Sequence, residues 1–510
     1  MKVNNKIKRM ITMWGLLIPL CLYAQATKWV YVYNDPNNAN DEGLVITYGL
    51  DNNIYVGGNS GHPTYSSYVI SLTADSGNFR WRTYEPPSSE VTVPVSIAYG
   101  TDGRIYVGGY FGVPQYFRSR VSCFDTSGNY VWQKVFTYYP VTYTNSMCYG
   151  DDGNIYVAVG SSLNVSPFYQ AFIVISYAPD GTQRWVHNNP SNGSTTTGAR
   201  DIVYGLDDYL YVCGAINGAR VVKCLNPANG NEIWRYTGTS GAFSRIVYGA
   251  DGNIYTGGHG RIASLTSFGT LRWDNIIPNA DQTEIVYGSD SNIYVMTDTT
   301  VSSFTSQGEL RWHHNVSPVG LNSIVYGLDG NIYVAGSRKD SINDSIYIHI
   351  CVISIDPSTG QQNWIFIYLP PELIDGSAHD MVFGLNGWLY LVGFGSNSSM
   401  KFDLFVMGLL PPTTSLKENT FKNIGLRIHP NPFFNHVAIK FQIPDNSLTS
   451  LKIYDPIGRI VKQWNYEILR RTEQIIWDGT DDFKQVLPPG FYFVVPEGVN
   501  LRPVKIVKMK

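Results

Sequence analysis

The stretch IVYGLDGNIYVAG, residues 324–336, is the pattern on which most of this 510-residue sequence is built. A catalytic motif needs to occur only once, so a stretch that keeps returning is read first as a structural unit. Its Tyr-Gly pair recurs at spacings of 51, 50, 55, 44, 39, 39 and 57 residues, at Tyr48, Tyr99, Tyr149, Tyr204, Tyr248, Tyr287 and Tyr326, with Phe383 as a variant eighth.

Each repeat predicts four short strands. An apolar strand such as SIVYG is followed by Asp-Gly or Asn-Asn, which we expect to supply the positive φ angles of a two-residue hairpin turn. The segment NIYVAG, a loop of variable length and a strand such as CVISI come next, and a fourth strand carries a tryptophan. Four strands in a period of about 40–50 residues are typical of the blades of a β-propeller.

The tryptophans predict how the ring closes. Seven of them follow a Tyr-Gly unit, but the eighth unit ends in DLFVMGLLPP and has none. Trp29 precedes Tyr48 by 19 residues, within the range of 14–19 that separates every other such tryptophan from the next repeat. The segment TKWVYVYN should therefore complete the last blade and satisfy both exposed sheet edges. Residues 27–412 are predicted to form an eight-bladed β-propeller closed by an N-terminal strand.

The turns LTADSGNFRW and ISIDPSTGQQNW resemble those of the PQQ-type, or quinoprotein-like, β-propeller repeats, and the resemblance covers most of residues 27–412. That superfamily includes dehydrogenases and non-catalytic scaffolds, so the resemblance implies the blade and not an activity. In the enzymes the ring carries PQQ and Ca²⁺ on its axis, often beneath a disulfide between adjacent cysteines. This sequence has no adjacent cysteines and its blades are short. We therefore expect no cofactor, no metal and a binding or scaffold role, with a quinoprotein-like enzyme acting at the channel mouth as the alternative.

A second domain begins where the repeat stops. The Pro- and Ser/Thr-rich residues 413–423 indicate a linker, and the alternating strands of residues 424–510 predict a small Ig-like β-sandwich. The segments PNPF at 430–433, LKIYDPIGRIV at 451–461, WDG at 477–479 and PPGFYF at 488–493 resemble the C-terminal sorting domain of type IX secretion cargo. The resemblance implies outer-membrane secretion machinery as the partner of residues 424–510. The alternative is a generic Ig-like adhesion module.

The N-terminus and the charge agree with export. Residues 1–26 have a basic start, a short apolar stretch and Ala24-Gln25-Ala26, the features of a signal peptide. The net charge of −3 falls to −7 without the four cations of this segment, which argues against nucleic acid as a partner. We expect a monomer that is secreted or displayed on the outer cell surface. Five cysteines remain in the mature chain, and we expect Cys213 and Cys224 to stay unpaired.

Two groups of residues are candidates for a binding site. The connections after the second and fourth strands vary in length between repeats and emerge on one face, and insertions gathered on one face often mark the binding side of a repeat protein. Aromatic residues there could stack on a glycan or hold a protein ligand, or could merely pack on neighbouring loops. They are Tyr110, Phe111, Tyr116, Phe117, Phe168 and Tyr169.

The second group lies three residues before each Tyr-Gly. This position is mostly polar and the next residue is always Ile or Met, so we expect it to face the central channel. Its charged members would form a collar able to hold a cation or a polar ligand, or would simply line a water-filled channel. They are Asp201, Arg245, Glu284 and Asp380.

Overall fold

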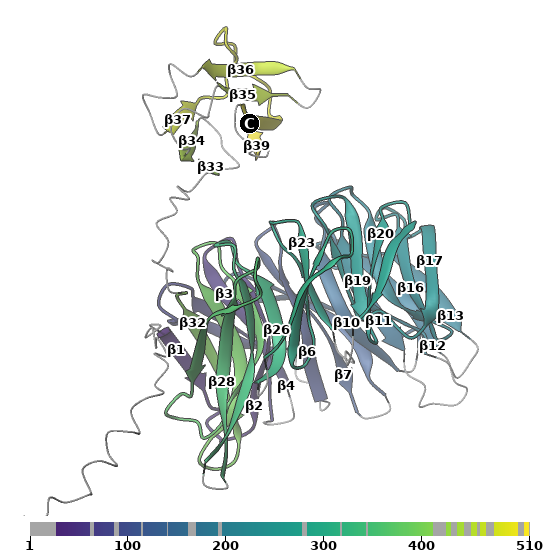
Figure 1. Cartoon of the computed structure of the whole chain (residues 1–510), viewed down its shortest axis with the longest axis vertical. Coiled ribbons are helices and arrows are strands. Elements are labelled where there is room, and N and C mark those ends of the chain that lie inside the picture. The colour runs from purple at the N-terminus through teal and green to yellow at the C-terminus, as the bar shows by residue number, and fades with distance from the viewer. Residues whose placement is uncertain are drawn as a thin grey trace, which may run out of the picture. The chain divides into compact units, whose positions relative to one another are not determined.

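The computed structural model describes two compact units, Met1–Pro412 and Thr413–Lys510, and each is considered by itself (Figure 1). The described residues are 27–411 and 425–508, except for 62–65, 86–90, 114–115, 140, 162–169, 192–195, 278–282, 317–318, 343–344, 430–435, 443–449, 456–458, 466–473 and 498–503. The predicted signal peptide, residues 1–26, lies outside them. Within the described residues, no helix has the length and apolar character needed to cross a bilayer.

The first unit consists of antiparallel sheets that follow one another along the chain. Six sheets have four strands each and one has eight, in the described part of the chain. Strands β1 to β16 are Thr27–Tyr33, Asp41–Tyr48, Asn53–Ser60, Ser66–Thr73, Phe79–Tyr84, Val91–Tyr99, Arg104–Gly112, Arg118–Asp125, Tyr130–Val135, Thr142–Tyr149, Ile155–Ser161, Gln170–Tyr177, Gln183–Ser191, Gly198–Tyr204, Leu210–Ile216 and Ala219–Leu225. Strands β17 to β32 are Glu232–Ser240, Arg245–Tyr248, Asn253–Gly258, Arg261–Thr266, Leu271–Ile276, Glu284–Tyr287, Asn292–Met296, Thr300–Thr305, Leu310–Asn315, Val319–Tyr326, Ile332–Ile342, Ser345–Ile355, Gln362–Tyr368, Ser377–Phe383, Leu389–Ser396 and Phe402–Leu409.

The first strands of successive repeats form a closed cycle. β2 contacts β6, and the contacts continue through β10, β14, β18, β22, β26 and β30 back to β2. The eight-stranded sheet joins β10–β13 to β14–β17 through a single residue pair, Gly160 with Gly198. The repeated units therefore surround a common centre, as the sequence predicted for a propeller.

The predicted pairing of the N-terminal strand with the last repeat is present. β1 runs antiparallel to β32, with Trp29 opposite Gly408 and Val32 opposite Phe405. The resulting sheet has the order β1–β32–β31–β30, so its outer strand comes from the other end of the unit. The indole of Trp29 packs in one buried cluster with Val56 and Ile70 of the next sheet. The start and the end of this unit are thus joined by both backbone pairing and packing.

The hairpin turns differ from the expected two-residue type. In each repeat, the hairpin loop between the first and second strands has three residues, counted inside the hydrogen bond that joins Gly249 to Asn253 or its equivalent. Only the third residue of this loop has a positive φ, as at Gly252 (φ 77°) and Gly330 (φ 83°). The amide of Gly252 donates to the carbonyl of Gly249 at 2.9 Å, which is the pattern of a type I turn followed by a left-handed residue. The expectation that Asp itself supplies a positive φ was wrong for these two turns, where Asp251 and Asp329 are not among the positive-φ residues. The Asp carboxylate instead accepts a bond from the Tyr hydroxyl of the following strand, as Asp251 does from Tyr255 at 2.6 Å.

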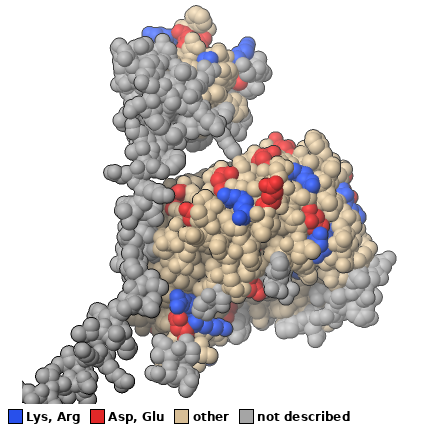
Figure 2. Space-filling view, viewed as in Figure 1, with Lys and Arg blue, Asp and Glu red and all other residues tan. Residues whose placement is uncertain are grey.

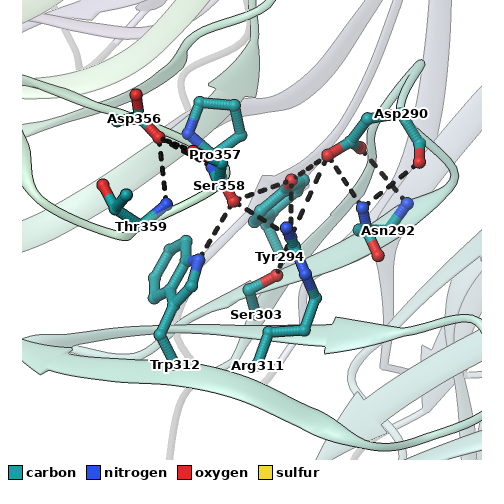
Figure 3. A network of polar contacts seen from close by, with 10 residues as sticks. All are labelled: Asp290, Asn292, Tyr294, Ser303, Arg311, Trp312, Asp356, Pro357, Ser358 and Thr359. Atoms are coloured by element: carbon teal, nitrogen blue, oxygen red, sulfur yellow. Dashed lines mark hydrogen bonds and ion pairs between the residues drawn. The ribbon is translucent and has the colours of Figure 1, made fainter.

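The recurrent tryptophans join neighbouring sheets through hydrogen bonds as well as packing. Figure 3 shows one example, in which Trp312 Nε1 donates to the carbonyl of Pro357 in the next repeat at 3.0 Å. Arg311 Nη1 donates to the same carbonyl at 2.9 Å and to Ser303 at 2.9 Å. Equivalent indole bonds to the next repeat are made by Trp29, Trp81, Trp132, Trp185, Trp234 and Trp273. Among the described residues, Trp364 has no such bond, because the repeat after it has no turn between its third and fourth strands.

The second unit has two antiparallel sheets, β33–β34–β37 and β36–β35–β38–β39. Side chains from both sheets share one buried cluster, which includes Ile439, Leu451 and the fully buried Trp477. The two sheets therefore pack face to face. Strands β33 to β39 are Gly425–His429, Val437–Gln442, Ser450–Tyr454, Ile460–Asn465, Gln474–Trp477, Gly490–Glu497 and Val504–Lys508.

Candidate functional site

The position three residues before each Tyr-Gly lies on the strands that surround the centre of the first unit. Its side chains reach across to the first strand of the next sheet. Ser96 Oγ on β6 donates to the carbonyl of Met147 on β10 at 3.3 Å, and Ser323 Oγ on β26 donates to Asp380 on β30 at 3.4 Å. Side chains at this position therefore also form hydrogen bonds that join neighbouring sheets.

Two of the three acids in the predicted collar use both carboxylate oxygens on backbone amides. Asp201 accepts from its own neighbour Ile202 at 2.9 Å and from Ile246 of the next sheet at 2.9 Å. Asp380 accepts from Met381 at 2.8 Å and from Ile46 at 3.0 Å. The Asp380–Ile46 bond connects β30 to β2, at the point where the last repeat meets the first. These acids tie strands together in addition to contributing charge.

The other two collar residues form an ion pair. Arg245 on β18 meets Glu284 on β22 through two contacts, Nε to Oε2 at 2.7 Å and Nη2 to Oε1 at 2.5 Å. The side chains remain 40% and 31% exposed, so water reaches them at the centre of the ring. Burial acts to lower the pKa of Arg245, but the charges of Glu284 and Asp201 raise it above its usual value. Each member of the pair thus favours the charged form of the other.

The acids of the collar influence one another. Burial raises the pKa of Asp380 to about 6, and the charge of Glu284 adds to the rise against the hydrogen bonds from Ile46 and Met381. Burial also raises the pKa of Glu284, and Arg245 opposes this. The structure therefore brings all four predicted collar residues within electrostatic reach, with three acids facing one base.

Sequence reasoning missed further polar residues beside the collar. In six repeats, the first strand has a β-bulge at the residue just before the collar position. The bulge places two successive residues opposite one residue of the partner strand. The bulged Asn145 donates to the carbonyl of Ala199 at 2.6 Å, and Asn322 donates to that of Ala378 at 2.7 Å. The bulged Arg200 is exposed. Two adjacent polar residues in an otherwise alternating strand were the available signal.

The predicted aromatic rim is only partly exposed. Tyr110 and Phe117 pack against each other with ring centroids 5.2 Å apart, and Tyr143 of the next sheet closes the cluster. The guanidinium of the buried Arg120 lies over the ring of Phe111, with 5.7 Å between Arg120 Cζ and the ring centroid. Tyr116 is the exposed member of this group, at 54%. Phe168 and Tyr169 lie outside the described residues.

The described residues do not fit the metal centre of a quinoprotein. No cluster of three or more His, Cys, Asp or Glu side chains among them could hold an ion. The carboxylates of Asp201 and Asp380 are already engaged by amides, and that of Glu284 by Arg245. All five cysteines from Cys123 to Cys351 in this part of the chain are free.

The surface charge is mixed. On the face seen in Figure 2, the charged side chains of the first unit are few, and acids and bases lie next to each other on a broad uncharged surface. This face has none of the concentrated positive charge with which proteins bind nucleic acid.

Comparison with known proteins gives matches to both units. Residues 218–366 match a PQQ-like repeat family whose description is "Outer membrane protein assembly factor BamB", and residues 427–507 match the "Secretion system C-terminal sorting domain" family. No curated protein matches the sequence. The chain thus carries PQQ-like propeller repeats and a type IX sorting domain, which indicates interaction with the secretion machinery and a location outside the cell or on its outer surface.

Of two similar solved structures, the first supports the fold of the first unit. The crystal structure of the C-terminal WD40 domain of Sif2 is similar with a TM-score of 0.52 at 12% identity, covering 73% of this chain and 97% of that one. Sqt1 from Chaetomium thermophilum gives a TM-score of 0.49 at 12% identity, covering 75% of this chain and 100% of that one. Identities this low concern the fold alone, which is that of a propeller.

Proposed function

We propose that this exported PQQ-like propeller is a binding or scaffold module for an extracellular glycan or protein. Residues 27–412 are one eight-bladed domain, in which the eight-stranded sheet counts as two blades joined at Gly160 and Gly198. Residues 413–423 are the linker, and residues 424–510 form an Ig-like sandwich that directs export after removal of residues 1–26. With its end strands paired to each other, the propeller needs no second copy to cover a sheet edge, and we expect a monomer.

The difference between the two faces of the ring is the observation that carries this proposal. On one face, the turns are short and held by repeated Tyr–Asp and Trp–carbonyl bonds. On the other face, which we call the variable-loop face, the connections after the second and fourth strands vary in length, from the two residues 217–218 to the longer segment 369–376. The collar, the bulged polar residues and Tyr116 belong to this side. Variation confined to one face of a rigid repeat is typical of a recognition surface.

The family model that matches the repeats is consistent with a non-catalytic role. The model that matches residues 218–366 is described as an assembly factor, which is a scaffold function. The collar is built from ties between strands, and its acids and base are mutually satisfied. Both features favour binding over catalysis for this chain.

The test compares substitutions on the two faces. The full chain is screened on immobilised glycans and on peptides of extracellular proteins, and the affinity of each hit is measured for four variants. Tyr116→Ala and Arg200→Ala on the variable-loop face should weaken binding by about tenfold or more. Leu206→Ala and Phe268→Ala serve as controls, because these residues are 73% and 85% exposed on the turn face. Equal loss from both pairs, or loss only from the turn-face pair, would contradict the proposal.

A further inference from the structure

A cavity of about 550 Å³ opens on the variable-loop face between the sheet that β1 completes and the sheet of β29. Three separate parts of the chain build it: the loop after β1, the connection after β29 and the loop between β31 and β32. Its volume lies in the range of small-molecule sites. The sequence could not reveal it, because its walls are more than 300 residues apart in the chain.

The wall of this cavity includes the carboxylate of Asp403, one oxygen of which is free to accept a hydrogen bond from a ligand. Asp403 is only 3% exposed, and its Oδ1 accepts a hydrogen bond from Asn397 at 2.8 Å. Within the described part of the chain, Asp403 Oδ2 has no hydrogen-bond partner, although the residue lines the cavity. Burial raises the pKa of Asp403, and the charge of Asp403 in turn raises that of the neighbouring Asp41. Because Asp403 lines the cavity, a group bound there can donate a hydrogen bond to Oδ2.

The amides beside Asp403 are held in place by one another. Asn38 Oδ1 accepts from Asn34 at 3.1 Å and from Asn397 at 2.9 Å. Asn38 also has a positive φ of 52°, a conformation that costs energy and persists only where the surroundings enforce it. The side-chain oxygen of Asn38 accepts both bonds, while its side-chain N–H groups have no acceptor among the described residues and can donate to a ligand. The cavity thus offers a donor next to an acceptor.

The rest of the lining limits the class of ligand. The side chains of Val30 and Val32 and the ring of the half-buried Tyr368 give an apolar wall. The carboxylates of Asp403 and Glu372 lie on the polar side, and the described lining includes no Lys, Arg or His. This composition disfavours phosphates, sulfates and uronic acids. It suits a molecule with a C–H face for the apolar wall and several hydroxyl donors for the carboxylates and amides.

We propose that this cavity is a binding site for a neutral sugar unit, such as the end of an extracellular glycan. The sugar's C–H face packs on Tyr368 and Val32, while its hydroxyls donate to Asp403 Oδ2 and accept from Asn38. This inference rests on the proposed binding function and assigns it a ligand class and a place on the ring.

The experiment applies the full-length protein to an array of neutral, uronic-acid-containing and sulfated glycans. Methyl hexopyranosides are then titrated and their contacts observed by saturation-transfer NMR. Binding to neutral glycans is expected, with little to the anionic ones. Asp403→Asn, which keeps the side-chain shape, and Tyr368→Ala should each weaken binding by about tenfold or more. Since either variant could disturb folding, the exposed Ser399→Leu provides a third, which fills the cavity and should abolish binding. Tyr347→Ala, 45% exposed and outside the lining, is the matched control and should bind normally.

The outcomes separate this inference from the proposed function. If neutral glycans bind but all three cavity variants retain full affinity, the ring is a binding module and the cavity is not its site. If only peptides or anionic glycans bind, the sugar assignment is overturned while the binding role stands. If Ser399→Leu and Tyr347→Ala lose binding equally, the cavity assignment also fails.

Discussion

At the scale of single residues, the repeated motif forms hydrogen bonds that cannot be read from its sequence alone. The buried Tyr of each repeat could be expected to pack, because aromatic residues favour strands and cores. Its hydroxyl would then be costly without a partner, and the turn Asp supplies one, as Asp290 does for Tyr294 at 2.5 Å. The Trp indole likewise needs an acceptor, and the turn carbonyl of the next repeat provides it. The motif therefore encodes contacts between sheets as well as the sheets themselves.

The indole bond can be measured by comparing two tryptophans. Trp312→Phe removes the bond to Pro357 and keeps an aromatic ring, and the carbonyl retains its bond from Arg311. A loss of about 1 kcal/mol beyond the change in packing is expected in urea unfolding. Trp364→Phe is the control, since Trp364 is similarly buried and makes no such bond within the described residues. An equal loss in both variants would show that packing alone explains the conservation of this residue type across the repeats.

At the scale of elements, the hairpin loop depends on one left-handed position. Five repeats place glycine there, whereas Asn52, Asp208 and Ser291 adopt the same conformation with φ of 61°, 64° and 64°. A side chain in this region costs about 1 kcal/mol relative to glycine, less for Asn and Asp. The repeats are thus not equally well adapted to the same turn.

Exchanging the residues between repeats should therefore change stability in opposite directions. Ser291→Gly is expected to stabilise the unit by up to about 1 kcal/mol, and Gly330→Ser to destabilise it by a similar amount. An added Cβ at Gly330 meets only the Tyr326 hydroxyl, at 4.0 Å, so steric overlap does not contribute. Thermal unfolding of both variants provides the measurement. A change of the same sign in both would rule out backbone conformation as the cause.

At the scale of the whole molecule, the junction between the last and first sheets holds two acids of raised pKa. Burial raises the pKa of Asp41 to about 6, the charges of Asp35 and Asp403 add to this, and the Asp35 amide opposes it. Asp380, which binds the amide of Ile46 across the same junction, also has a pKa of about 6. Since both values lie above the ordinary 3.8, the folded protein binds these protons more tightly than the unfolded chain. Their contribution to stability is complete below about pH 4 and is lost as the pH rises through 6.

This linkage predicts a falling urea midpoint between about pH 4 and pH 6. Asp41→Asn should reduce the fall, because the amide keeps an acceptor for Asp35 and no longer titrates. Asp180→Asn is the control: the pKa of the exposed Asp180 is lowered by the Thr182 amide, so its effect is confined to lower pH. A pH profile of Asp41→Asn identical to that of the natural protein would contradict the assignment.

Much of the architecture could be predicted from the sequence, and the reasons for the rest are physical. The closure by Trp29 was predictable because the seven other repeat tryptophans each lie 14–19 residues before the next repeat. The bulges were missed because only a break in the alternation, such as the adjacent polar residues Asn145 and Ser146, marks them in the sequence. The four collar residues lie near one another in the structure, but the engagement of Asp380 by the amide of Ile46 depends on the neighbouring sheet and could not be predicted. The cavity at Asp403 required three distant loops to be placed together.

The central claim is that the two ends of the first unit share one sheet, and hydrogen–deuterium exchange of the full chain tests it most directly. The amides of β1, residues 27–33, should be as protected as those of β32, residues 402–409, and both should be released together as denaturant is added. Exchange of residues 27–33 within seconds, while residues 402–409 stay protected, would contradict the closed ring.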